Sequence, residues 1–268
     1  MKLTAKNYFT NKNRYLSNSK VGDWLKDKRF FYEKHILGTV PNKESDPLII
    51  GKAVDMWLTG SRLQFEKNYI KVARRSKDVD GPIQLTTLQY DEIVGLCESV
   101  ERTSAFKETK GFKKQVILQQ DIELGLFSGL CGIPDWIRVK DNVCYIRDLK
   151  TSRTINPIKY YYHSLDYGYF RQQAMYQMIA KATWPDINKF ISEHIVVEKD
   201  PDKIYKVAVF KLDQNIIDKE KENLKGIITD ITKEKKFERE DVSFKDAPTL
   251  TDPRVALASE DEDDWDSI

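Results

Sequence analysis

The stretch from 132 to 150, GIPDWIRVKDNVCYIRDLK, constrains the fold of this 268-residue chain more than any other. Its two halves alternate apolar and polar residues with the period of two that is typical of β-strands. Between them stands Asp141-Asn142, a dipeptide that favours a two-residue turn. We therefore predict an antiparallel hairpin. The expected cross-strand pairs are Ile137 with Ile146 and Val139 with Cys144.

The same register places the carboxylates of Asp135 and Asp148 opposite each other, about 4.5–5.5 Å apart at Cβ, where they repel. Like charges at the end of an apolar face do not stabilise a fold, so we expect a positive charge between them. Hard oxygen ligands suit magnesium or manganese, and Lys150 projects from the same strand face as Asp148. Spacing alone leaves two readings open. One is a metal site equipped for attack of water on a phosphodiester, and the other is a solvated hairpin with an Asp–Lys surface pair.

Several motifs in the chain follow the order of a known family. Pro134-Asp135 and Asp148-Leu149-Lys150 resemble the signature of the PD-(D/E)xK nuclease superfamily, most closely that of phage and prophage exonucleases of the RecE and lambda-exonuclease kind. Three further segments resemble elements of that branch, and they are Gln172 with Tyr176 (QxxxY), GKAVDMWLTG from Gly51 (an upstream helix that usually reads GxAxH) and the strands in VVEKDPDKIYKVAVF. The ordered set is more specific than any single motif. It covers roughly residues 16 to 240.

This resemblance implies an α/β fold with a restriction-endonuclease-like core, in which helices flank a mixed central β-sheet. It implies a metal-dependent deoxyribonuclease, in the first instance an exonuclease that resects linear double-stranded DNA from its ends for phage-type recombination. Because one core serves many nucleases, two alternatives stay open. They are an endonuclease or structure-specific nuclease, and a catalytically silent DNA-end-binding protein.

The resemblance also implies roles for individual residues. The implied catalytic residues are Asp135, Asp148, Lys150, Gln172 and Tyr176. The implied metal ligands are Asp135, Asp148, the carbonyl oxygen of Leu149 and Asp55, with Mg²⁺ as the cofactor and Mn²⁺ able to substitute for it.

Two residues depart from the pattern of the family. Asp55 stands where relatives usually have a His, and it is either a replacement ligand for a hard cation or a solvated flank of its helix. Gln115 stands where relatives often have a Glu, and its neutral amide would bind a second metal more weakly than a carboxylate. The extra carboxylate of Asp55 is a candidate to compensate for that lost charge.

Composition limits the class of protein. The content of 40% hydrophobic and 32% charged residues is typical of a soluble globular chain. No apolar window is long enough to cross a bilayer and the N-terminus lacks a hydrophobic signal core, so we expect a cytoplasmic protein of a bacterial host cell without membrane contact. The cysteines, Cys97, Cys131 and Cys144, form no CxxC pair and are too few for the four-cysteine iron–sulfur cluster of some superfamily members. We therefore expect no such cluster.

Charge divides the chain unevenly. The net charge is +2, but the last nine residues hold six acidic groups and no basic one, which leaves the rest at about +8. A basic folded part suits a polyanionic partner. We predict a nuclease domain over residues 1–244 and a disordered acidic C-terminal tail over 245–268. Three readings of the tail stay open, namely solubility, docking of partner proteins, and mimicry of phosphate in the DNA groove.

Basic loop residues supply candidate DNA contacts, with surface solvation as the alternative. They are Arg74, Arg75, Lys77 and Arg153. The aromatic run from Tyr160 to Tyr162, followed by His163, would either stack on splayed bases or pack against the sheet, and we favour packing. Expected partners are linear duplex ends, a single-strand annealing recombinase or single-strand binding protein, and a second copy of the chain in a homo-oligomer.

Overall fold

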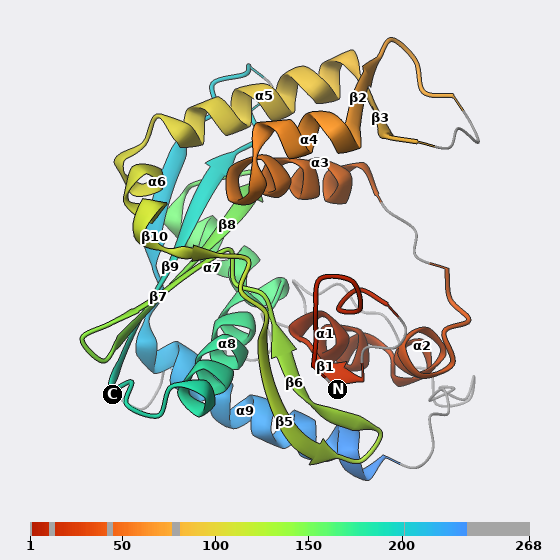
Figure 1. Ribbon diagram of the computed structural model, residues 1–268, viewed down its shortest axis with the longest axis vertical. Coiled ribbons are helices and arrows are strands. Elements are labelled where there is room, and N and C mark those ends of the chain that lie inside the picture. Colours follow the sequence, from red (N-terminus) through yellow and green to blue (C-terminus); the bar gives the residue numbers. More distant parts are fainter. Residues whose placement is uncertain (1, 11–13, 42–44, 77–80, 201, 235–268) are drawn as a thin grey trace, which may run out of the picture. The chain divides into compact units, whose positions relative to one another are not determined.

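The computed structural model describes residues 2–10, 14–41, 45–76, 81–200 and 202–234, and Figure 1 shows how their helices and strands are arranged. At the centre is a mixed five-stranded sheet in the order β10-β9-β8-β7-β4. Its strands are Val207–Lys211 (β10), Lys189–Glu198 (β9), Val143–Ser152 (β8), Trp136–Lys140 (β7) and Lys113–Lys114 (β4). Strand β9 runs parallel to β8, and the other neighbouring pairs are antiparallel.

The predicted hairpin forms β7 and β8. Asp141 and Asn142 make its turn with φ of 52° and 59°, the left-handed values that a type I′ turn requires. The predicted cross-strand pairs are confirmed, and they are Ile137 with Ile146 and Val139 with Cys144.

The strands between 114 and 150 do not form one continuous antiparallel meander. Strands β5 and β6 pair with each other, and β6 also pairs with β1 in a separate three-stranded sheet. These strands are Leu118–Leu124 (β5), Phe127–Gly132 (β6) and Tyr15–Leu16 (β1). The chain leaves this sheet through residues 133–135, and Pro134 has no N–H to donate to a ladder. Asp135 therefore lies where the two sheets divide.

A helical crossover joins β8 to β9, as parallel neighbours require. It consists of α7 (Pro157–Asp166) and α8 (Tyr169–Thr183). Helix α7 begins at Pro157, and the side chain of Asn156 accepts hydrogen bonds from the N–H groups of Ile158 and Lys159. This crossover brings α8 back against the sheet.

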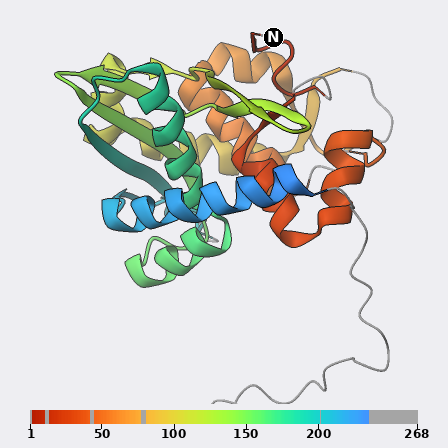
Figure 2. The same ribbon diagram turned by 90° about the horizontal axis from the view of Figure 1, so that it is seen from below.

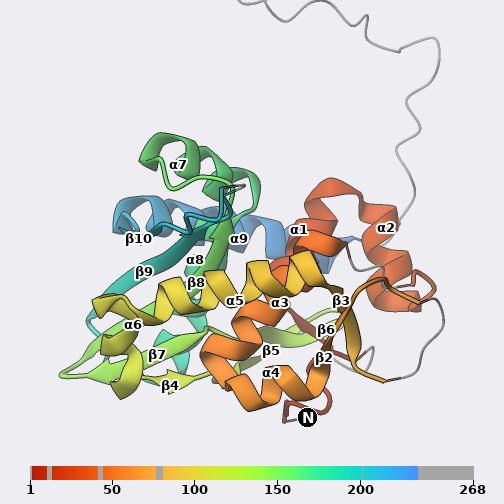
Figure 3. The same ribbon diagram turned by 90° about the horizontal axis from the view of Figure 1, so that it is seen from above.

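Helices cover both faces of the central sheet. On one face Leu149, Ile195 and Val197 pack into a core with α3 (Asp46–Asp55) and α5 (Thr87–Glu101). Figure 3 shows these two helices on their side of the sheet. On the other face Ile146 and its strand neighbours pack with α8 and α9 (Gln214–Lys233), the long blue helix of Figure 2. The structure is thus a helix–sheet–helix sandwich, and the predicted mixed sheet flanked by helices is confirmed.

Shorter elements complete the described part. They are α1 (Asn18–Lys26), α2 (Lys28–Tyr32), π-helical turns at Glu33–Leu37 and Met56–Gly60, α4 (Arg62–Asn68), β2 (Tyr69–Val72), β3 (Ile83–Thr86), α6 (Ser104–Glu108) and a 3₁₀ turn at Thr109–Gly111. Helices α1 and α2 are separate because the side chain of Asp27 accepts the N–H of Phe30 and starts α2. The predicted tail over 245–268 lies outside the described residues. Within the described ranges, no helix has both the length and the apolar character needed to cross a membrane.

Candidate active site

Two strands and a helix end bring three carboxylates together. Trp136 pairs with Arg147 at the end of the hairpin, so Asp135 and Asp148 are the next residues in register. The backbone N–H of Asp135 donates to Oδ1 of Asp148 over 3.4 Å. Asp55 is the last residue of α3 and directly precedes a π-helical turn, a local distortion that is frequent at functional sites.

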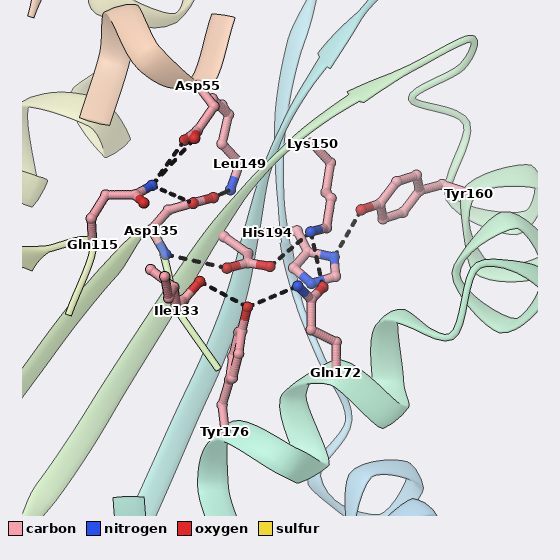
Figure 4. A network of polar contacts seen from close by, with 11 residues as sticks. Asp55, Gln115, Ile133, Asp135, Leu149, Lys150, Tyr160, Gln172, Tyr176 and His194 are labelled. Atoms are coloured by element: carbon pink, nitrogen blue, oxygen red, sulfur yellow. Dashed lines mark hydrogen bonds and ion pairs between the residues drawn. The ribbon is translucent and has the colours of Figure 1, made fainter. Parts of the chain in front are cut away.

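Gln115 connects two of these carboxylates (Figure 4). Its Nε2 lies 3.2 and 3.3 Å from the two carboxylate oxygens of Asp55 and 3.2 Å from Oδ1 of Asp135. Its backbone N–H donates to the carbonyl oxygen of Asp135 over 3.1 Å. Both residues that depart from the family pattern, Asp55 and Gln115, therefore belong to the same cluster.

Lys150 lies beside this cluster and is held from three sides. Its Nζ donates to Oδ2 of Asp148 over 2.7 Å and to Oε1 of Gln172 over 3.0 Å. It also lies 4.6 Å from the ring centroid of Tyr169, a cation–π contact. Asp148 is only 1% exposed, so the ammonium is the charge that compensates for its burial.

Helix α8 carries both Gln172 and the residue that holds its side chain in place. Gln172 and Tyr176 are one helical turn apart, and Nε2 of Gln172 donates to the hydroxyl of Tyr176 over 2.8 Å. That hydroxyl donates in turn to the carbonyl oxygen of Ile133 over 2.9 Å. The structure thus brings both residues of the QxxxY element to Lys150 and to the point where the sheets divide.

Burial and mutual repulsion raise the pKa values of two carboxyl groups. For Asp135 the pKa lies well above its ordinary value of 3.8, first because of burial and then because of the charges of Asp148 and Asp55. Burial likewise raises the pKa of Asp55. Burial works to lower the pKa of Lys150, but its electrostatic interactions with Asp148, Tyr169 and Asp135 outweigh burial and the net shift is upward. Lys150 is therefore an ammonium at neutral pH.

The donor set fits a divalent cation. Among the described residues, no three His, Cys, Asp or Glu side chains converge closely enough to hold an ion by themselves. Mg²⁺, however, is usually held by one or two carboxylates with water completing its shell, and Asp135 with Asp148 offers such a pair. The backbone N–H of Leu149 donates to Oδ2 of Asp135 over 2.6 Å and orients that carboxylate. A cation would also relieve the repulsion that raises the pKa of Asp135.

The candidate DNA contacts differ in their surroundings. Arg74 and Arg153 are exposed. Arg75 instead forms an ion pair of 2.7 Å with Asp46 and donates to the side chain of Gln89 over 2.6 Å. Lys77 lies outside the described residues.

The sequence did not indicate one buried residue beside the site, His194. His194 on β9 pairs in register with Asp148, and its Nδ1 shares a 2.8 Å hydrogen bond with the hydroxyl of Tyr160. Its Nε2 has no hydrogen-bond partner among the described residues. Tyr160 also stacks on Phe210 with ring centroids 4.7 Å apart, which confirms packing for this member of the aromatic run, while Tyr162 is 60% exposed. The one signal for His194 was its position directly before the apolar residues Ile195–Val197 of β9.

Comparison with known proteins agrees with this geometry. The family described as a PDDEXK-like domain of unknown function (DUF3799) matches residues 23–245. The chain belongs to this family. The resemblance to the PD-(D/E)xK superfamily is thereby confirmed.

One solved structure supports the fold of this PDDEXK-like protein. A crystal structure from Eubacterium rectale, of a protein named as a candidate exonuclease, aligns with a TM-score of 0.65 and 19% identity over 97% of this chain and 99% of that chain. At this identity the match shows the fold alone. The crystal structure of SSO0001 aligns with 19% identity over 53% of this chain and 63% of that chain. Its TM-score of 0.29 is too low to indicate a shared fold. No curated protein matches the sequence.

Proposed function

We propose that this PDDEXK-like protein is a metal-dependent deoxyribonuclease, and specifically an exonuclease that resects linear double-stranded DNA from its ends for phage-type recombination. The observation that carries the proposal is the convergence of Asp135, Asp148 and Lys150 at the division between the two sheets. Burial of two acids beside one lysine costs stability, and such clusters are typical of functional sites. The name of the Eubacterium rectale protein favours the exonuclease reading over an endonuclease or a silent DNA-end-binding protein.

Asp135, Asp148 and the carbonyl oxygen of Leu149 are the proposed ligands of Mg²⁺, with Mn²⁺ as a substitute. A contribution from Asp55 requires its carboxylate to leave the amide of Gln115. When bound, the cation supplies Lewis-acid stabilisation of phosphoryl charge and lowers the pKa of a water.

The chain's own residues position and stabilise the reacting groups. Because Lys150 is an ammonium, it donates hydrogen bonds to the attacking water or to a phosphate oxygen and does not act as the base. Asp148 and Gln172 fix its Nζ. Tyr176 fixes the amide of Gln172 by bridging it to the Ile133 carbonyl. This chain of contacts would hold the ammonium in place before substrate arrives.

Further parts of the proposal concern the surroundings of the site. We propose that residues 1–244 form the nuclease domain and that the acidic tail follows it. Arg74, Arg75, Lys77 and Arg153 are the proposed contacts to the DNA backbone, and single-strand annealing recombinases and single-strand binding proteins are the proposed protein partners. A homo-oligomer and a cytoplasmic location in the bacterial cell belong to the same proposal.

Digestion of matched DNA substrates tests the activity. Linear duplex and covalently closed circular duplex are incubated with the protein and Mg²⁺. An exonuclease degrades only the linear form, an endonuclease cuts both, and a binding protein cuts neither.

Asp148→Asn tests the site itself. The change keeps the shape of the side chain and removes its charge, so we expect a loss of cleavage of about 100-fold or more. The matched control is Asp186→Asn, at an exposed carboxylate in the loop before β9, which should cleave like the wild type. Full activity in Asp148→Asn would refute the assignment of the site.

A further inference from the structure

The side-chain amide of Gln115 has an unusual surrounding. Four oxygen atoms lie 3.1–3.3 Å from its Nε2, and they are both carboxylate oxygens of Asp55, Oγ1 of Thr59 and Oδ1 of Asp135. A primary amide carries two hydrogens, so it cannot give each of the four a good hydrogen bond. A nitrogen surrounded by more acceptors than it has hydrogens occupies the kind of place that a cation fills.

The orientation of this amide follows from its neighbours. If the group were turned over, Oε1 would face the carboxylates of Asp55 and Asp135. The hydroxyl of Thr59 would not compensate, because it already donates to the backbone carbonyl of Asp55 over 2.8 Å. With the carboxylates ionised, the network therefore favours the nitrogen pointing into the cluster.

The backbone of Gln115 also has an unusual conformation. Its φ is +49°, a left-handed value that is strained for a residue with a Cβ. The preceding strand β4 pairs with β7, and the N–H of Gln115 donates to the carbonyl of Asp135. The strained turn brings the amide to the carboxylates, as Figure 4 shows.

We infer that the amide of Gln115 is a built-in substitute for a second divalent cation between Asp55 and Asp135, so that the site takes a single ion, at Asp135 and Asp148. This inference rests on the proposed function. A neutral amide satisfies the oxygens only by hydrogen bonding and brings no full positive charge. It therefore holds Asp55 in place without offering an exchangeable metal site. Replacing the amide nitrogen by a carboxylate oxygen would turn a donor into a ligand and convert this place into a second metal site.

Counting bound Mn²⁺ tests the inference without an activity assay. Free Mn²⁺ is measured by electron paramagnetic resonance during titration of the protein, and we expect one bound ion per wild-type chain and two per Gln115→Glu chain. Gln64→Glu, which adds the same charge on the exposed α4 helix, is the control and should keep one. Circular dichroism checks that each variant is folded. If Gln115→Glu does not fold, Gln115→Ala, which removes the amide without adding charge, should bind a second ion more weakly than the first.

The outcomes separate the inference from the proposed function. Two ions in the wild type, or one ion in every folded variant at position 115, would overturn the inference and leave the nuclease proposal standing. No bound ion in the wild type would overturn both. One ion in the wild type and two in Gln115→Glu would support both.

Discussion

Replacement of Asp135 by Asn should stabilise the metal-free protein. Burial opposes ionisation of Asp135, and so do the charges of Asp148 and Asp55. An Asn keeps an oxygen that can accept the N–H of Leu149, now accepted by Oδ2 over 2.6 Å. The change thus removes the repulsion and keeps the hydrogen bond from Leu149, while it gives up the one that Oδ1 accepts from Gln115.

Distances in the cluster give the size of the effect. Oδ1 of Asp135 and Oδ1 of Asp55 each lie 3.2 Å from the same nitrogen of Gln115, so they are no more than twice that distance apart. At an effective dielectric constant of about 20, two charges at that limit repel by about 2–3 kcal/mol. Allowing for screening by solvent, we expect Asp135→Asn to raise the free energy of unfolding by about 1–3 kcal/mol in the absence of metal.

The sign of the pH dependence follows from the raised pKa values. Between 3.8 and the higher pKa of the folded state, the folded protein binds more protons than the unfolded chain at Asp135 and Asp55. The stability of the metal-free wild type therefore falls as pH rises through this window. The advantage of Asp135→Asn should be greatest above the window and should vanish as pH approaches 3.8.

Urea unfolding in EDTA, followed by tryptophan fluorescence, measures this difference at several pH values. Trp136 is fully buried next to the substituted residue and reports on its surroundings. The control Asp186→Asn should change stability by no more than about 0.5 kcal/mol. Mg²⁺ should stabilise the wild type and not Asp135→Asn. A variant that is less stable than the wild type in EDTA, or whose advantage does not depend on pH, would refute the reasoning.

Further predictions concern the lysine, its support, the metal and the DNA contacts. Lys150→Met should reduce cleavage of linear duplex by about 100-fold or more while Mn²⁺ still binds, as single-turnover assays and calorimetry would show. Tyr176→Phe leaves the Ile133 carbonyl without its donor and should cost about 1–3 kcal/mol in urea unfolding, with slower cleavage. Mg²⁺ at about 100 times its dissociation constant should stabilise the protein by about 2.7 kcal/mol, and EDTA should reverse this. Arg74→Ala should weaken binding to duplex DNA and lower the salt dependence by about one phosphate contact, whereas Arg75→Ala should do less because Asp46 already holds that side chain.

The sequence predicted the local parts of the site well, because their geometry is decided by near neighbours. Strand alternation and the Asp141-Asn142 turn determine the register of the hairpin, and that register determines where Asp135 and Asp148 lie. The helical spacing of Gln172 and Tyr176 likewise needs no long-range information.

Contacts between distant segments could not be predicted. The division of the sheets at Pro134 depends on the pairing of β6 with β1, which is more than 110 residues away along the chain. The contact between Asp55 and Gln115 depends on where the end of α3 meets the residue that follows β4. Both of these contacts are determined by tertiary packing, which cannot be predicted from local periodicity.

Manganese in a crystal of the wild-type protein tests most directly whether the carboxylates of Asp135 and Asp148 exist to hold a divalent ion. Crystals soaked in Mn²⁺ are measured near the manganese absorption edge. We predict one strong anomalous peak in contact with oxygens of both Asp135 and Asp148. A map with no peak there, or with the ion bound elsewhere on the chain, would contradict the account.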